Sequence, residues 1–152
     1  MKERIIFLDI DGVLNSRVYD RERTLNDGNI DLTRLPLLRE IVERTGAKIV
    51  LSSSWRKHWD KMGEARDAIG EELNQTFLSA GLEIYDKTPV IGDRAKEISA
   101  WLKCHPEVYE YVIFDDVFGG WGEHEGHLVK TSPLIGRGIM ENHVSDAIRI
   151  LS

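Results

Sequence analysis

The sequence has 152 residues, of which 41% are hydrophobic and 30% charged, a composition typical of one folded domain rather than of a disordered chain. No apolar run approaches the roughly 18 residues of a membrane-spanning helix, and the first residues lack the apolar core of a signal peptide. One cysteine excludes an internal disulfide framework and a net charge of −6 argues against a general affinity for nucleic acid, so we expect a single cytoplasmic domain over residues 1–152.

Short apolar runs without polar alternation predict strands that are buried on both faces, as in a parallel sheet. The three strongest runs are residues 5–8, 49–51 and 111–114. Two weaker candidates are residues 82–85 and 127–130. The pattern therefore predicts five strands.

The first amphipathic stretch predicts a helix that begins near Leu35 and ends at Gly46. Apolar residues recur there at helical spacing, Thr33 precedes them as the expected N-cap, and glycine is a common helix stop. A second helix is expected over residues 60–80, with a break near Gly70.

Two further helical patterns follow. Asp93 is placed to cap a helix with one apolar face, and residues 144–151 form a last amphipathic stripe. Strands that alternate with helices predict an α/β fold, here a doubly wound, Rossmann-like parallel sheet of five strands with helices on both faces. Such folds bind ligands at the carboxyl ends of their strands. The residues directly after each strand are therefore the first candidates for a site.

Acidic and serine side chains follow the three strongest strands. Asp9 and Asp11 come after the first, Ser52 after the second, and Asp115 and Asp116 after the one that precedes the last. Converging carboxylates repel one another unless a cation joins them, and a hard divalent ion such as Mg²⁺ prefers oxygen ligands of this kind. Within the Asp-x-Asp pair, one carboxylate can act as nucleophile and the other as proton donor and acceptor. Phosphomonoester hydrolysis, a very slow uncatalysed reaction, gains most from such a pair beside a metal.

Residues 7–15, FLDIDGVLN, resemble motif I of the haloacid dehalogenase (HAD) superfamily of phosphotransferases. The strand that ends at Ser52 is similar to motif II, and residues 112–116 are similar to motif IV. The ordered set also resembles the small HAD domains of RNA-repair proteins and their stand-alone phage and bacterial relatives. The segments that carry this narrower resemblance are residues 51–56, 93–98 and 115–116. The resemblance implies a HAD-like phosphatase.

The resemblance also implies a role for each residue at the strand ends. Asp9 would attack phosphorus and form an aspartyl-phosphate. Asp11 would protonate the leaving oxygen, activate the hydrolytic water and lend its backbone carbonyl to Mg²⁺. Ser52 would hold a phosphate oxygen. Asp9, Asp115 and Asp116 would bind the metal, with Asp116 as the expected direct ligand and Asp115 acting directly or through water, although the reverse order stays open.

The phosphate-stabilising cation, a lysine in most of the superfamily, has three candidates in this sequence. Arg94 stands at the start of the helix before the strand that carries the acidic pair, which is the expected place. Lys96 and Lys87 are the alternatives. An arginine would clamp phosphate with its planar fork, whereas a lysine would act as a compact charge.

Two features indicate the class of substrate. Residues 16–32 separate motif I from the first helix and suffice for a flap but not for a folded cap domain, and the resulting open site suits a bulky substrate such as a nucleic-acid end. The basic run at residues 55–61 follows motif II and could meet an extended anion. The residues expected to contact the substrate are Ser53, Arg56, Lys57 and Lys96.

The sequence therefore predicts a Mg²⁺-dependent phosphomonoesterase that acts on a nucleotide or on the terminal phosphate of a nucleic acid, at the 5′ or the 3′ end. The alternative is a phosphate-binding or regulatory module of the same fold with little turnover. The intact Asp9 and Asp11 argue against it, because a binding site has no need of a nucleophile and an acid together. A response-regulator receiver would carry an acidic pair after its first strand instead of Asp-x-Asp-Gly. The oligomeric state stays open.

Overall fold

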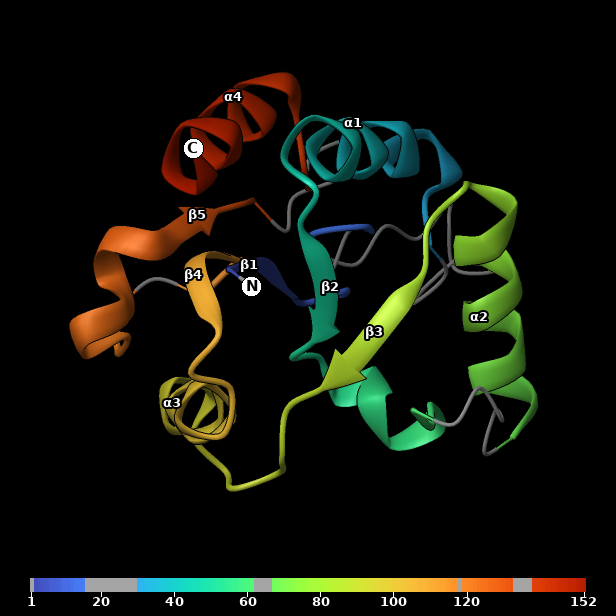
Figure 1. Ribbon diagram of the computed structural model, residues 1–152. Helices are drawn as coiled ribbons and strands as arrows, with labels where there is room; N and C mark the ends of the chain where they lie inside the picture. Colours follow the sequence, from blue (N-terminus) through green and yellow to red (C-terminus); the bar gives the residue numbers. More distant parts are fainter. Residues whose placement is uncertain (1, 16–29, 62–66, 118, 133–137) are drawn as a thin grey trace.

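Strands lie side by side and all parallel in one sheet, in the order β3-β2-β1-β4-β5 (Figure 1). The computed structural model describes residues 2–15, 30–61, 67–117, 119–132 and 138–152. Within them the strands are β1 (Glu3–Leu8), β2 (Lys48–Leu51), β3 (Ile84–Lys87), β4 (Val108–Asp115) and β5 (Leu128–Lys130). The predicted α/β fold with a doubly wound five-stranded sheet is confirmed.

The central strand β1 is apolar throughout its second half because both of its faces are covered. Ile6 and Leu8 pack into one hydrophobic cluster, and Ile5 and Phe7 pack into another on the opposite face. All four side chains are completely buried. This two-sided burial explains why the sequence shows a continuous apolar run instead of an alternating one.

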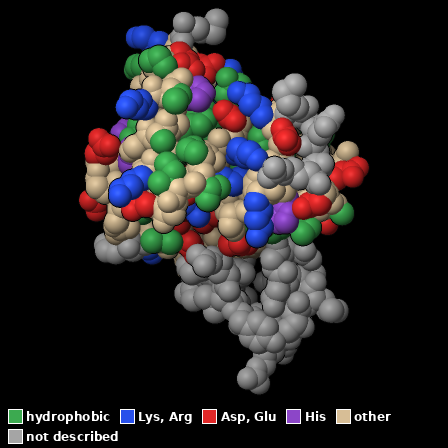
Figure 2. Space-filling view, turned by 90° about the horizontal axis from the view of Figure 1, so that it is seen from below, with side chains coloured by type: hydrophobic (Ala, Val, Ile, Leu, Met, Phe, Trp, Pro, Cys, Tyr) green, Lys and Arg blue, Asp and Glu red, His purple; other side chains and the backbone are tan. Residues whose placement is uncertain are grey.

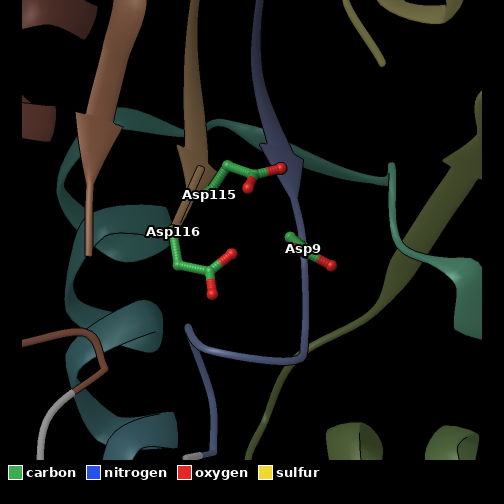
Figure 3. Close-up of side chains that lie close together, drawn as sticks. All are labelled: Asp9, Asp115 and Asp116. Atoms are coloured by element: carbon green, nitrogen blue, oxygen red, sulfur yellow. The ribbon is translucent and has the colours of Figure 1, made fainter. Parts of the chain in front are cut away.

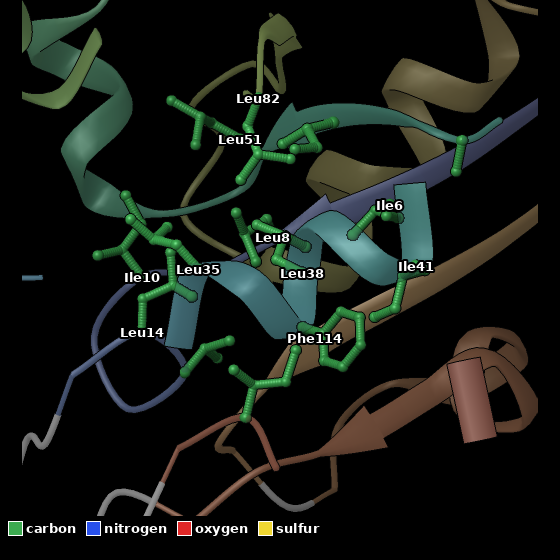
Figure 4. Packing of buried hydrophobic residues seen from close by; sticks show 14 of the residues in the cluster. Ile6, Leu8, Ile10, Leu14, Leu35, Leu38, Ile41, Leu51, Leu82 and Phe114 are labelled. Atoms are coloured by element: carbon green, nitrogen blue, oxygen red, sulfur yellow. The ribbon is translucent and has the colours of Figure 1, made fainter. Parts of the chain in front are cut away.

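Helices cover the two faces of the sheet unequally. The helices α1 (Leu35–Thr45), α2 (Ala68–Ser79) and α4 (Glu141–Leu151) contribute to the larger cluster, whose packing around Leu38 and Phe114 is visible in Figure 4. The helix α3 (Arg94–Lys103) covers the other face (Figure 1). Its first turn lines a cavity together with Asp9 and Asp115, which lie at the carboxyl ends of β1 and β4.

The first helix begins and ends where the sequence predicts, but its entry differs. Gly46 stops α1 in the left-handed conformation, with a φ of 72°. Thr33 is not its N-cap, because Thr33 belongs to a short 3₁₀ helix, Leu32–Arg34, that precedes α1 directly. The cap of that turn is Asp31, whose carboxylate accepts the Thr33 N–H.

Side-chain capping also fixes where the next two helices, α2 and α3, begin. The predicted break at Gly70 is wrong, because Gly70 lies in the first turn of α2 and its N–H donates to the capping carboxylate of Asp67. The predicted cap of α3 is confirmed, since Asp93 accepts the backbone N–H of Lys96.

The sequence predicts neither a folded cap domain nor a membrane-spanning helix. The described residues contain no cap domain, while residues 16–29, most of the interval in which we expected a flap, lie outside the described part. Among the described helices, none has the length and apolar character needed to cross a membrane.

Candidate active site

Three carboxylates meet at the carboxyl edge of the sheet (Figure 3). Asp9 follows β1, Asp115 ends β4 and Asp116 comes next in the chain. Because β1 and β4 are paired neighbours, the residues that follow them lie side by side. Each of the three offers an oxygen within 4.8 Å of those of the other two. A group of oxygen ligands of this kind fits a hard divalent cation such as Mg²⁺.

Burial makes ionisation of these carboxyls unfavourable. It raises the pKa of Asp9 to about 7, with the nearby charge of Asp115 adding to the rise and Arg94 opposing it. Burial also raises the pKa of Asp115, as does the neighbouring Asp116. A bound divalent cation would offset both effects, because it stabilises the ionised form of every carboxylate it touches.

A single guanidinium faces two of the buried acids. Nη1 of Arg94 lies 3.7 Å from Oδ1 of Asp9 and 3.6 Å from Oδ2 of Asp115. The side chain is 30% exposed, so it also borders solvent. A cavity of about 240 Å³ opens at this point, lined by Asp9, Arg94 and Asp115 together with the loop that leads to Trp121.

Ser52 and Arg94, both next to Asp9, each bury one polar atom without a hydrogen-bond partner among the described residues. These atoms are Oγ of Ser52 and Nη1 of Arg94. Ser52 follows β2, and its backbone N–H donates to the carbonyl of Leu8, which fixes it next to Asp9. Most buried polar atoms in proteins are paired. Both groups can donate hydrogen bonds, and both suit the oxygens of a phosphate.

Asp11 is not a member of the three-carboxylate group that fits a divalent cation, although the chain turns back as predicted. Gly12 has a φ of 84°, and a Cβ built on it would lie 2.3 Å from Oδ2 of Asp116, so the turn requires glycine. The carboxylate of Asp11 accepts hydrogen bonds from Asn15 Nδ2 and Trp55 Nε1. A role for the Asp11 carbonyl in metal binding stays a prediction.

The other two candidate cations lie elsewhere. Nζ of Lys87 donates to the carbonyls of Arg56 and Trp59, at 3.1 and 2.7 Å, and so holds the 3₁₀ helix Ser54–His58 in place. Lys96 is exposed on α3. Arg94 is therefore the candidate that contacts Asp9.

A family model for the HAD domain in Swiss Army Knife RNA repair proteins matches residues 5–144. The chain belongs to this family. The superfamily and the narrower group predicted from the motifs are both confirmed. No curated protein matches the chain. Membership supports a hydrolase of the phosphatase type.

The basic run at residues 55–61 does not form the fully exposed patch that we expected, because one of its cations is buried. Arg56 is buried and only 5% exposed, with Nη1 donating to the carbonyls of Ser52 and Ser53 and Nη2 lying 2.9 Å from Glu97 Oε2. Lys57 is exposed. Figure 2 shows that basic side chains on the face beneath α3 and this 3₁₀ helix are scattered among acidic and apolar ones. Arg56 therefore organises the site from the interior.

Ser53 also has a structural contact in the HAD domain. Its Oγ accepts the backbone N–H of Trp55 and caps the 3₁₀ helix Ser54–His58. A contact between substrate and Ser53, Lys57 or Lys96 stays a prediction.

Three residues of the site received no role from sequence reasoning. Asn15 and Trp55 bind the Asp11 carboxylate, and Glu97 lies between the guanidinium groups of Arg56 and Arg94. Asn15 and Trp55 lie inside the motif I and motif II segments, and this position could have indicated that they belong to the site. Glu97 is three residues after Arg94 on α3, a spacing that places the two on one helix face.

Substituting Asn for Asp9 is expected to stabilise the metal-free HAD domain at high pH. A carboxyl with a pKa of 3.8 when unfolded and about 7 when folded contributes full stability below about pH 4 and loses it as pH rises through 7. Asn does not ionise, so the free energy of unfolding of Asp9→Asn should exceed that of the wild type by about 2–4 kcal/mol at pH 8. At pH 4 the two free energies should differ little. Thermal unfolding in EDTA at both pH values measures this. A gain that is independent of pH would exclude ionisation of Asp9 as its cause.

Proposed function

We propose that this HAD domain is a Mg²⁺-dependent phosphomonoesterase that works through an aspartyl-phosphate on Asp9. The observation that carries the proposal is that Asp9 contacts two kinds of partner. Asp115 and Asp116 are the other members of the group that fits a divalent cation. Arg94, which lies against both Asp9 and Asp115, would contact the phosphate through its guanidinium.

The residues divide the work of the first step. Asp9, Asp115 and Asp116 would hold Mg²⁺, which supplies positive charge next to the transferring phosphoryl group. The Asp9 carboxylate attacks phosphorus as the bond to the leaving oxygen breaks, and Asp11 gives its proton to that oxygen. The Ile10 N–H donates to Oδ1 of Asp9 at 2.8 Å and orients the nucleophile.

The second step returns the enzyme to its starting state. Asp11, now ionised, takes a proton from water, and the water oxygen attacks the phosphorus of the aspartyl-phosphate. The bond to Asp9 breaks, inorganic phosphate leaves and Asp11 is again protonated. Ser52 Oγ and Arg94 Nη1, both without hydrogen-bond partners among the described residues, would donate to the non-transferring oxygens in both steps.

The favoured substrate is a phosphorylated nucleotide or the phosphorylated end of a nucleic acid. Three observations support this class. The family is named for domains of RNA repair proteins, and the described residues contain no cap domain that would enclose a small metabolite. The net charge of −6 fits recognition of an end better than a grip along the backbone.

Phosphate release from a panel of substrates tests the function. The panel holds 4-nitrophenyl phosphate, a nucleoside 5′-monophosphate, a nucleoside 3′-monophosphate and oligonucleotides with a phosphate at either end, each with Mg²⁺ and with EDTA. We expect turnover in the presence of Mg²⁺ and none in EDTA. We also expect a higher kcat/KM for one nucleotide or oligonucleotide than for the aryl phosphate. Equal turnover in EDTA would contradict the metal requirement.

The alternative, a binding module with little turnover, predicts another outcome of the same panel. Such a protein would bind a phosphorylated oligonucleotide with Mg²⁺ in a calorimeter and release no phosphate from any member of the panel. The retained pair of Asp9 and Asp11 favours the enzyme.

A further inference from the structure

The carboxylate of Asp11 is held by two donors that come from different parts of the fold. Nδ2 of Asn15 donates to Oδ1 at 3.0 Å. The indole Nε1 of Trp55 lies 3.3 Å from Oδ1 and 3.2 Å from Oδ2, so its N–H is shared between the two oxygens. This arrangement restricts rotation of the carboxylate about its last bond.

The first donor is itself fixed by the turn that carries Asp11. Oδ1 of Asn15 accepts the backbone N–H of Gly12 at 3.0 Å, and Asn15 is only 5% exposed. Because the oxygen of the amide is paired with a donor, its nitrogen must face Asp11. The segment Asp11–Asn15 therefore closes a hydrogen-bonded loop on itself.

The second donor reaches Asp11 from the segment after β2. Trp55 lies in the 3₁₀ helix Ser54–His58, its backbone N–H donates to Ser53 Oγ, and its ring packs against the larger hydrophobic cluster. Arg56 holds the start of the same turn through the carbonyls of Ser52 and Ser53. The indole is thus anchored on a rigid turn, and it joins the strand end that carries Ser52 to the one that carries Asp11.

We propose that Trp55 is a positioning residue for the acid–base step, holding Asp11 in the orientation in which it gives a proton to the leaving oxygen and later takes one from water. This inference rests on the proposed function. Oδ1 of Asp11 accepts from both Asn15 and Trp55, whereas Oδ2 accepts from Trp55 alone among the described residues.

The test compares two leaving groups in Trp55→Phe, which keeps an aromatic ring and removes the N–H. Nitrophenolate leaves without a proton, so the variant should form the aspartyl-phosphate from 4-nitrophenyl phosphate at a near-normal rate. Hydrolysis of that intermediate needs Asp11 and should slow on the order of 10- to 100-fold, a part of what general acid–base catalysis supplies. The expected result is a burst of about one nitrophenol per active site before a slow steady state. An alkyl phosphate should show a similar or larger loss of kcat and no burst.

The matched control is Trp59→Phe. Trp59 directly follows the same 3₁₀ helix, is buried, and donates its indole N–H to Asn74 Oδ1 at 3.4 Å, away from Asp11. A general loosening of this segment would affect both variants, and neither would show a burst. Trp55→Phe with wild-type kinetics for both substrates, or with equal losses and no burst, would overturn the positioning role.

A second measurement detects the hydrogen bond between Trp55 and Asp11 without any catalytic turnover. The indole ¹⁵N–¹H resonance of Trp55, assigned by its loss in Trp55→Phe, should move in Asp11→Asn, while those of Trp101 and Trp121 stay in place. An unmoved Trp55 resonance would overturn the inference and leave the phosphatase untouched. A wild type that releases no phosphate would overturn the proposed function and this inference with it.

Discussion

Asp9→Asn should lower kcat for every phosphomonoester that the wild type hydrolyses, by on the order of 10⁴-fold or more, the loss typical when a nucleophile is removed. The amide has the shape of the carboxylate and fits the same buried space, but its oxygen does not form a stable bond to phosphorus. Steady-state kinetics with Mg²⁺ measure the loss. Acid-quenched Asp9→Asn protein should also lack the phosphoryl group that we expect on the acid-quenched wild type.

The control for this substitution is Asp146→Asn. Asp146 lies on α4, on the sheet face opposite α3, is half exposed and pairs with Arg149. Its activity should equal that of the wild type. Because the metal-free Asp9→Asn protein is expected to be the more stable one at pH 8, unfolding would not explain its lost activity. Substantial turnover by Asp9→Asn would show that another group attacks phosphorus.

The positions at the strand ends could be predicted because parallel strands place their carboxyl ends at one edge of the sheet. Asp9 and Asp115 follow apolar runs whose burial on both faces the residue types already indicate. The turn at Gly12 was predictable for a different reason, because glycine after Asp-x-Asp marks a chain reversal. Knowing which strands neighbour one another was not needed, because all the candidates share that edge.

Contacts that depend on packing between distant segments could not be predicted in this way. Arg56 stands in a run of cations that is typical of a solvated surface, and its partner Glu97 lies on α3, beyond β3. Local capping was ambiguous too, because both Asp31 and Thr33 are good N-cap residues, and the 3₁₀ helix that uses Asp31 as its cap contains Thr33. The strand expected at residues 82–85 begins at Ile84, after a turn at Gly81.

Glu97→Gln should lower the free energy of unfolding by roughly 3–5 kcal/mol, the usual cost of leaving one charge of a buried ion pair without its partner. Arg56 and Glu97 have side chains that are 6% and 4% exposed, with Nη2 and Oε2 2.9 Å apart. The same Oε2 accepts the backbone N–H groups of Ile91 and Gly92, which Gln can still satisfy in part. Urea unfolding with Mg²⁺ absent measures the loss.

Two comparisons separate the buried charge from other effects of this substitution. Glu43→Gln removes a carboxylate from an exposed pair on α1, at 2.7 Å from Arg39, and should cost under about 1 kcal/mol. Arg56→Met combined with Glu97→Gln should cost less than the sum of the two single variants, because no unpaired charge remains buried. Additive losses would mean that the pair acts through packing alone. Oε1 of Glu97 also lies 3.6 Å from Nε of Arg94, so this buried pair borders the guanidinium that contacts Asp9.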